Sequence, residues 1–298
     1  MTEYSRGRAP TQPAQDFQRA FGIGIALNVA YVVVQVVFGV FGHSLALIAD
    51  AGHNFGDVLA LVLAWLASHL MKRPATPRRT YGWRRTSIMA ALFNAIFLLV
   101  AVGGITWEAV RRFLHHEVVD ANVVIWVAAA GVILNGATAW LFVSGRKTDL
   151  NLRAAFMHMA ADAAISAGVV LAGVAILLTG RAWLDPLASI LINVVIVIGT
   201  WSLLRESFNL ATDAVPEHVD LVAVRKYLAG LPDVAAVHDL HIWAMSTTEV
   251  ALTAHLVMPN EPGSDALLHD VCEHLHRVFG IEHATIQVEQ NAESCSLA

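Results

Sequence analysis

The sequence has little charge for its length. Only 14% of its 298 residues are Asp, Glu, Lys or Arg, whereas 56% are hydrophobic, and this balance excludes an ordinary soluble domain of the same size. No long basic run is present, which argues against a nucleic-acid partner. The two cysteines, Cys272 and Cys295, lack CxxC spacing and give no basis for a disulfide framework or redox chemistry. We therefore expect a multi-spanning membrane protein.

Six apolar stretches, each near the 20 residues that cross a bilayer, follow a polar tail at residues 1–16. The tail has neither the apolar core nor the cleavage site of a secretory signal, so the first stretch is expected to be a span. Together the stretches predict a transmembrane domain over residues 17–210. They lie at about 19–41, 44–70, 87–112, 121–143, 153–179 and 184–208.

Basic residues are distributed unevenly between the two sides of these spans. Lys and Arg concentrate before the first span, after the second and after the fourth, whereas the opposite side carries only Arg111, Arg112 and Arg181. Cytoplasmic loops of membrane proteins carry such an excess. Both termini are therefore predicted to lie in the cytoplasm, with the protein in the inner (plasma) membrane.

The pattern changes after about residue 210. Residues 211–290 predict a small α+β cytoplasmic domain, followed by a tail at 291–298. A domain of this size buries little apolar surface on its own, so dimerisation would stabilise it. The expected order is helix, strand, strand, helix, strand (αββαβ), at about 217–230, 237–245, 249–258, 264–279 and 284–289.

Acidic residues are rare inside the apolar stretches. Away from the span ends they are Asp50, Asp57 and Asp162, and no Lys or Arg is near them in the sequence. A carboxylate at mid-membrane costs roughly 2.5–3.5 kcal/mol, so each is a functional hypothesis. His53 precedes Asp57 by four residues, and His158 precedes Asp162 by four. This spacing places each His–Asp pair on one helix face, one turn apart.

If the second and fifth helices pack together, two imidazole nitrogens and two carboxylate oxygens converge in a set suited to tetrahedral Zn²⁺. Two carboxylates balance one divalent cation, and all four groups also bind protons, so metal and protons compete for them. The imidazoles argue against Mg²⁺ and Ca²⁺ and leave Zn²⁺, Co²⁺, Ni²⁺ and Cd²⁺. The alternative is a structural polar cluster that joins the helices.

Other polar residues of the spans are assigned less specific roles. Asp50 shares the helix face of His53 and is a candidate residue of the ion pathway, with a hydrated helix-start residue as the alternative. The amide side chains are expected to form hydrogen bonds between helices rather than to bind metal. They are Asn28, Gln35, Asn54, Asn94 and Asn135.

Two other classes of protein are alternatives to a transporter, namely an intramembrane metalloenzyme with the same ligands and a membrane metal sensor. An intramembrane metalloenzyme needs an open coordination position for water, which four protein ligands do not leave, and the sequence has no HExxH motif. A membrane metal sensor would not need the intramembrane pairs. The pattern therefore favours a transporter rather than an enzyme, with Zn²⁺ as its substrate and no bound cofactor.

Five segments of the chain are distinctive in combination: SLALIADAGHNFGD (44–57), RRTYGWRRTSIMAALFNA (78–95), NLRAAFMHMAADA (151–163), VHDLHIWAMS (237–246) and EHATIQVE (282–289). Through them the chain resembles, over nearly its full length, the zinc-transporting branch of the cation diffusion facilitator family. The resemblance implies a homodimer with a metallochaperone-like cytoplasmic domain and proton-coupled export of divalent metal from the cytosol. It assigns His53, Asp57, His158 and Asp162 to the transport site, with His at position 53 typical of zinc preference over cadmium.

Two further expectations concern the cytoplasmic side. By the same resemblance, Arg85 and Asp213 form a charge interlock that couples the two parts of the protein, with solvated charges as the alternative. His241 and His255 lie on adjacent predicted strands, and the last strand begins near His283 and ends at Glu289. The expected ligands of a regulatory Zn²⁺ site are His241, His255, His283 and Glu289.

Overall fold

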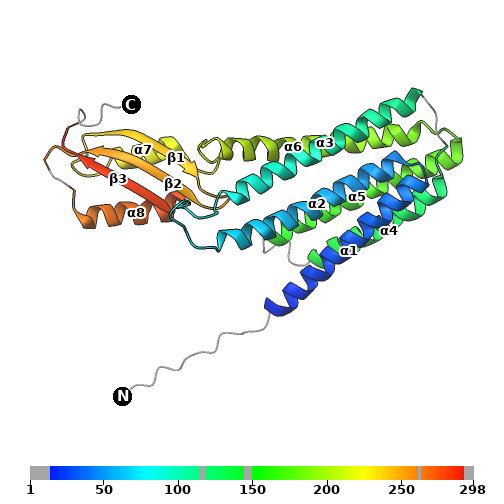
Figure 1. The fold of residues 1–298 in the computed structure, drawn as a ribbon, viewed down its shortest axis with the longest axis horizontal. Coiled ribbons are helices and arrows are strands. Elements are labelled where there is room, and N and C mark those ends of the chain that lie inside the picture. The colour runs from blue at the N-terminus through cyan, green and yellow to red at the C-terminus, as the bar shows by residue number, and fades with distance from the viewer. Residues whose placement is uncertain (1–13, 115–117, 144–149, 261–262, 292–298) are drawn as a thin grey trace, which may run out of the picture. The chain divides into compact units, whose positions relative to one another are not determined.

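The computed structural model describes residues 14–114, 118–143, 150–260 and 263–291 (Figure 1). The expected terminal tails lie largely outside these ranges. Six long helices precede a small α+β part, which confirms the expected fold class. In the described residues the elements are α1 (Ala14–Phe41), α2 (Leu45–Met71), α3 (Thr86–Leu114), α4 (Ala121–Phe142), α5 (Leu150–Thr179), α6 (Leu184–Ala211), α7 (Leu221–Ala229), β1 (Ala236–Ala244), β2 (Val250–Val257), α8 (Asp265–Phe279) and β3 (His283–Glu289).

Five of the described helices, α2 to α6, are long and apolar enough to cross a membrane. The described side chains of α1 add a shorter apolar stretch, Asn28–Phe41. Helices satisfy their backbone hydrogen bonds internally, which is what a chain must do in lipid. The protein is therefore a multi-pass membrane protein.

Polar side chains mark where several helices begin. At the start of α2 the Ser44 hydroxyl accepts a hydrogen bond from the Leu47 amide at 3.1 Å. At the start of α4 the Asp120 carboxylate accepts from the amides of Asn122 and Val123. These caps pair amides that the first turn of a helix leaves without partners. The helix starts are therefore encoded by single residues beside the apolar runs.

Helix α7 begins later than the expected 217–230. A turn closed by a 2.9 Å hydrogen bond from the Val219 amide to the Pro216 carbonyl precedes it. The Asp220 carboxylate then caps the helix by accepting hydrogen bonds from the amides of Val222 and Ala223. Leu221 is therefore the first helical residue. The proline turn and the cap together account for the difference.

The described chain divides into two compact units, Met1–Leu59 with Leu98–Ile198, and Ala60–Phe97 with Gly199–Ala298. In the first unit α4 packs against α5 and α1 (Figure 1). Its core consists mainly of Ala, Val and Ile residues, and the small alanines allow helices to approach closely. The fully buried members of this core are Ala46, Leu47, Ala49, Val124, Ala128 and Val169.

One close approach in the first unit requires glycine. A Cβ atom at Gly131 of α4 would lie 2.0 Å from the Tyr31 hydroxyl of α1. That hydroxyl donates a 3.3 Å hydrogen bond to the Val127 carbonyl, one turn earlier on α4. The absence of a side chain at position 131 thus lets a polar group of α1 reach the backbone of α4.

The second unit contains a three-stranded sheet in the order β1, β2, β3 (Figure 1). Strand β2 pairs antiparallel with β1 and parallel with β3. A bulge interrupts β1, because His238 pairs with His255 whereas His241 pairs with Thr253, and Asp239 between them has a positive φ of 48°. One extra residue in β1 therefore places His238 and His241 on the same face of the sheet as His255.

Candidate functional site

The two His–Asp pairs of α2 and α5 come together in the first unit. The His53 Nε2 atom lies 3.0 Å from an Asp162 oxygen and 4.0 Å from an Asp57 oxygen. The His158 Nε2 atom lies 3.6 Å from the same Asp57 oxygen and 3.8 Å from the other Asp162 oxygen. Each imidazole thus contacts both carboxylates. The structure brings together all four side chains that the sequence predicts, two from each helix.

These separations match the size of a metal coordination shell. Ligand atoms about 2.0–2.2 Å from a tetrahedral Zn²⁺ lie about 3.3–3.6 Å from one another. Ligand atoms of His53, Asp57 and Asp162 all lie within 4.8 Å of one another. The Asp162 side chain is only 3% exposed, whereas that of His158 is 47% exposed. The four residues therefore form a group that is closed on one side and accessible on the other.

Asp50, a candidate residue of the ion pathway, forms hydrogen bonds with two other helices. It is fully buried, and one carboxylate oxygen accepts hydrogen bonds from the Gln35 amide at 2.6 Å and the Ser166 hydroxyl at 3.1 Å. Gln35 also accepts a bond from Asn54 and donates one to Tyr31. Burial rules out a hydrated helix-start residue. Asp50 belongs to an interhelical polar network, as expected for Gln35 and Asn54, and no direct bond joins it to the four-residue group in the described chain.

A further buried carboxylate, Asp185, lies at the end of a span, where an acidic residue is not by itself unusual. Asp185, in the first turn of α6, is fully buried. Its carboxylate accepts hydrogen bonds from the Ser44 hydroxyl at 2.5 Å and from the amides of Leu45 at 2.6 Å and Ala46 at 3.4 Å. Asp185 therefore caps the start of α2 from a different helix. The motif LDP gave no sign of this partner.

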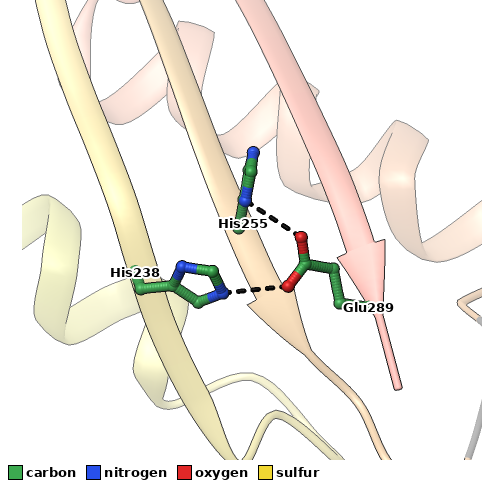
Figure 2. A group of neighbouring side chains, drawn as sticks. All are labelled: His238, His255 and Glu289. Atoms are coloured by element: carbon green, nitrogen blue, oxygen red, sulfur yellow. Dashed lines mark hydrogen bonds and ion pairs between the residues drawn. The ribbon is translucent and has the colours of Figure 1, made fainter. Parts of the chain in front are cut away.

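On the cytoplasmic-domain sheet, three side chains from three strands form a second group (Figure 2). The Glu289 carboxylate lies 3.0 Å from His238 Nε2 through one oxygen and 3.0 Å from His255 Nδ1 through the other. The rings of the two histidines meet edge to face, with centroids 5.1 Å apart. His255 and Glu289 were expected at this site, whereas His238 was not.

The two other expected ligands, His241 and His283, make no direct contact with Glu289 in the described residues. His241 bonds through Nε2 to Asp239 at 2.9 Å, and Asp239 is also 3.5 Å from His255. His283 packs edge to face against Tyr81. It begins the strand that Glu289 ends, and six residues of strand span about 20 Å. The length of β3 keeps His283 away from the group, and the bulge in β1 brings His238 to it.

Both carboxylates around this group are ionised near neutral pH. Burial by itself raises the pKa of Glu289, but hydrogen bonds from His238 and Gln287 and the nearby imidazoles bring that pKa below its ordinary value. The hydrogen bond to His241 likewise lowers the pKa of Asp239. Ionised carboxylates beside imidazoles provide the donor set that Zn²⁺ prefers.

The expected pair Arg85–Asp213 is in contact. The Arg85 guanidinium donates to the Asp213 carboxylate, and both side chains are about half exposed. Nearby, Arg84 lies 3.2 Å from Glu249 of the cytoplasmic domain, and the Ser87 hydroxyl accepts from the Thr247 amide at 3.1 Å. The beginning of α3 is thus joined to the second unit's sheet by several polar contacts.

Two protein-family models match adjoining parts of the chain. The model described as cation efflux transmembrane domain covers residues 22–210. The model described as cation efflux protein, cytoplasmic domain, covers residues 216–291. A solved C-terminal domain of the CzcD transporter from Cupriavidus metallidurans, described as metal-bound, is 38% identical over 24% of this chain and 99% of that chain, with a TM-score of 0.21.

Curated relatives match over most of their length. The metal cation efflux system protein CzcD of Cupriavidus metallidurans is 36% identical, covering 91% of this chain and 86% of the relative. The zinc transporter ZitB of Escherichia coli is 36% identical over 91% and 85%. The cadmium, cobalt and zinc/H(+)-K(+) antiporter of Bacillus subtilis is 30% identical over 91% and 89%. The chain therefore belongs to the cation efflux family of metal transporters, also called cation diffusion facilitators.

Proposed function

We propose that this protein exports a divalent metal, with Zn²⁺ as the preferred substrate, in exchange for protons. The transport site consists of His53, Asp57, His158 and Asp162. The observation that carries the proposal is the approach of two imidazoles and two carboxylates, contributed by α2 and α5, to separations of 3.0–4.0 Å. No Lys or Arg forms an ion pair with these carboxylates in the described residues, so a cation is the partner that they lack.

Charge explains the coupling to protons. One divalent ion neutralises the carboxylates of Asp57 and Asp162, so the loaded site carries no net charge in a low-dielectric surrounding. Imidazole and carboxylate groups bind metal only in their deprotonated forms. Metal binding therefore releases protons, and protonation releases metal. A site that alternates between these two states while it opens to opposite sides exchanges metal for protons.

The alternative functions have less support. The relatives are named as transporters, and the family is not one of enzymes. A membrane metal sensor has no use for four ligands grouped within the spans. The proposal of zinc rests on the mixed imidazole and carboxylate ligands and on relatives named for zinc, cadmium and cobalt.

The assembly and orientation are part of the same proposal. We infer a homodimer, consistent with the small core of the cytoplasmic domain and with the matching family domain. Both termini lie in the cytoplasm, with the chain in the inner membrane, because Lys and Arg concentrate on that side of the spans. In this arrangement Arg85 and Asp213 link the beginning of α3 to the residue that leads into the cytoplasmic domain.

Exchange is tested with the full chain in proteoliposomes that have an acidic interior. Radioactive Zn²⁺ added outside is expected to accumulate, because outward proton movement drives uptake, and a pH dye inside should report alkalinisation. Nigericin, which collapses the gradient, should stop the accumulation. Asp57→Ala is the matched control and should show neither signal. Accumulation that persists undiminished after collapse of the gradient would exclude proton exchange.

We further propose that His238, His255 and Glu289 bind a regulatory Zn²⁺. Their nitrogen and oxygen atoms come from three strands, and Glu289 is only 3% exposed. A metal at this position would replace the two contacts that Glu289 makes with the histidines. Because the three side chains come from three neighbouring strands, a bound metal would join these strands and make the sheet more rigid at the end of β3.

Substitutions of two histidines distinguish the group of His238, His255 and Glu289 from the set of ligands predicted from the sequence, which includes His283 and lacks His238. In full-length protein carrying Asp57→Ala and Asp162→Ala, His238→Asn should weaken Zn²⁺ binding by at least about 10-fold, as for changes near metal ligands. His283→Asn should leave the affinity unchanged, because His283 packs on Tyr81. Competition with a fluorescent chelator measures both. A larger loss with His283→Asn than with His238→Asn would contradict the assignment.

A further inference from the structure

The segment that joins α2 to α3 has a defined shape and an unusual density of arginine. The Thr76 and Arg79 backbones exchange hydrogen bonds of 3.0 and 2.9 Å, and the Gly82 amide donates to the Arg79 carbonyl at 2.9 Å. Gly82 has a φ of 68°, which suits glycine in this tight turn. The backbone of this segment therefore has a defined turn between the ends of two long helices.

A cavity of about 460 Å³ opens within this segment. Its apolar part is formed by Met89 of α3 and by Trp243 and Met245 of the cytoplasmic domain. Thr80, Tyr81, Trp83 and Thr86 also line it. Four arginines complete the lining: Arg78, Arg79, Arg84 and Arg85.

The charges of these arginines are only partly balanced. Arg84 pairs with Glu249, and Arg85 pairs with Asp213. Arg79 stacks on Trp83, with 3.8 Å between the guanidinium carbon and the ring centroid, which leaves the edge of the guanidinium available to hydrogen-bond acceptors. Arg78 has no carboxylate within 4.0 Å in the described chain. Two positive charges thus lack an anion.

The cavity also lies next to the membrane boundary. Helix α2 ends at Met71 and α3 begins at Thr86, and both are long and apolar enough to cross a bilayer. The preference for basic residues in cytoplasmic loops accounts for the number of arginines in this segment. That preference does not require these arginines to line one cavity together with Met89, Trp243 and Met245. Arginine pairs hold phosphate groups through bidentate hydrogen bonds, and methionine and tryptophan suit an acyl chain.

We propose that this cavity binds an anionic phospholipid, whose phosphate contacts Arg78 and Arg79 and whose glycerol and first methylenes lie against Met89 and Met245. Phosphatidylglycerol is the simplest ligand of this chemistry. Bound lipid would fill the space between the beginning of α3 and the sheet that carries Trp243. Lipid composition would then affect how firmly these two elements are joined.

The test is native mass spectrometry of the full-length protein, titrated with phosphatidylglycerol or phosphatidylcholine. The parent protein should bind phosphatidylglycerol with clear preference. Arg78→Gln with Arg79→Gln should weaken this binding by about 10-fold or more, beyond the effect of general charge. The matched control is Lys72→Gln with Arg73→Gln, which removes the same charge from the same segment outside the cavity lining and should weaken it by less than about 3-fold.

Three results would overturn the proposal. The first is equal binding of the two lipids by the parent protein. The second is an equal loss in both double variants, which would reduce the effect to general charge. The third is displacement of phosphatidylglycerol by an equal concentration of inorganic phosphate, which would indicate a site for the free anion. Gradient-driven Zn²⁺ uptake by each variant shows that it is folded.

Discussion

Asp162→Asn is expected to abolish gradient-driven Zn²⁺ uptake while leaving the protein folded. Asparagine keeps the shape of the side chain but removes the charge and one acceptor from the most buried member of the four-residue group. Changes that only misorient metal ligands cost about 10–100-fold in affinity, so loss of a ligand should cost at least about 100-fold. Initial rates of radioactive Zn²⁺ uptake in proteoliposomes measure the effect.

The control for this substitution lies one turn along the same helix. Ser166→Ala removes a hydrogen bond to Asp50 and no metal ligand. It should retain most of the uptake, with a modest cost for the lost bond. If Asp162→Asn transported as fast as Ser166→Ala, Asp162 could not be a ligand of the transported ion.

Asp185→Asn is expected to destabilise the transmembrane part more than any other single change of an acid to its amide. The buried carboxylate accepts from the Ser44 hydroxyl and from two amides at the start of α2. An amide nitrogen in place of one oxygen faces donors that it cannot pair. Each buried donor that is left without an acceptor costs about 1–3 kcal/mol, so the free energy of unfolding should fall by about 2–5 kcal/mol. Thermal unfolding of the detergent-solubilised protein should show a clearly lower midpoint.

Asp120→Asn provides the comparison for Asp185→Asn. Asp120 is an exposed N-cap of α4, and asparagine caps helices nearly as well as aspartate. Its unfolding midpoint should stay close to that of the parent. Equal midpoints for the two variants would show that the contact between α6 and the start of α2 contributes little to stability.

The grouping of His53, Asp57, His158 and Asp162 could be predicted because local geometry determines most of it. A four-residue spacing places His53 beside Asp57 and His158 beside Asp162 on any helix. Only the packing of α2 near α5 had to be assumed, and the need to neutralise buried carboxylates supplied a reason for it. The structure adds the distances and the difference in exposure between Asp162 and His158.

The cytoplasmic group could not be predicted in full, because it depends on a backbone irregularity. In a regular strand, His238 and His241 would point to opposite faces, since they are three residues apart. The bulge at Asp239 places both on the face of His255. A left-handed aspartate in a strand is uncommon, and sequence alone gave no reason to expect one here.

The partners of two buried acids were also beyond sequence reasoning. Asp185 accepts a hydrogen bond from Ser44, which lies more than a hundred residues earlier in the chain. Asp50 accepts hydrogen bonds from Gln35 and Ser166 on two other helices. Such contacts depend on which faces of the helices meet. Helices that are apolar on nearly all sides have no distinct amphipathic pattern, so their sequences do not specify which faces meet.

The central claim is that four side chains of α2 and α5 hold the transported ion. X-ray absorption of Zn²⁺ bound to full-length protein carrying His238→Asn and Glu289→Gln tests it directly, because the cytoplasmic group is then removed. The account predicts a four-coordinate shell of two imidazole nitrogens and two oxygens at about 2.0–2.2 Å, lost in Asp57→Ala. A six-coordinate shell of oxygens alone, or a shell that Asp57→Ala leaves unchanged, would contradict the account.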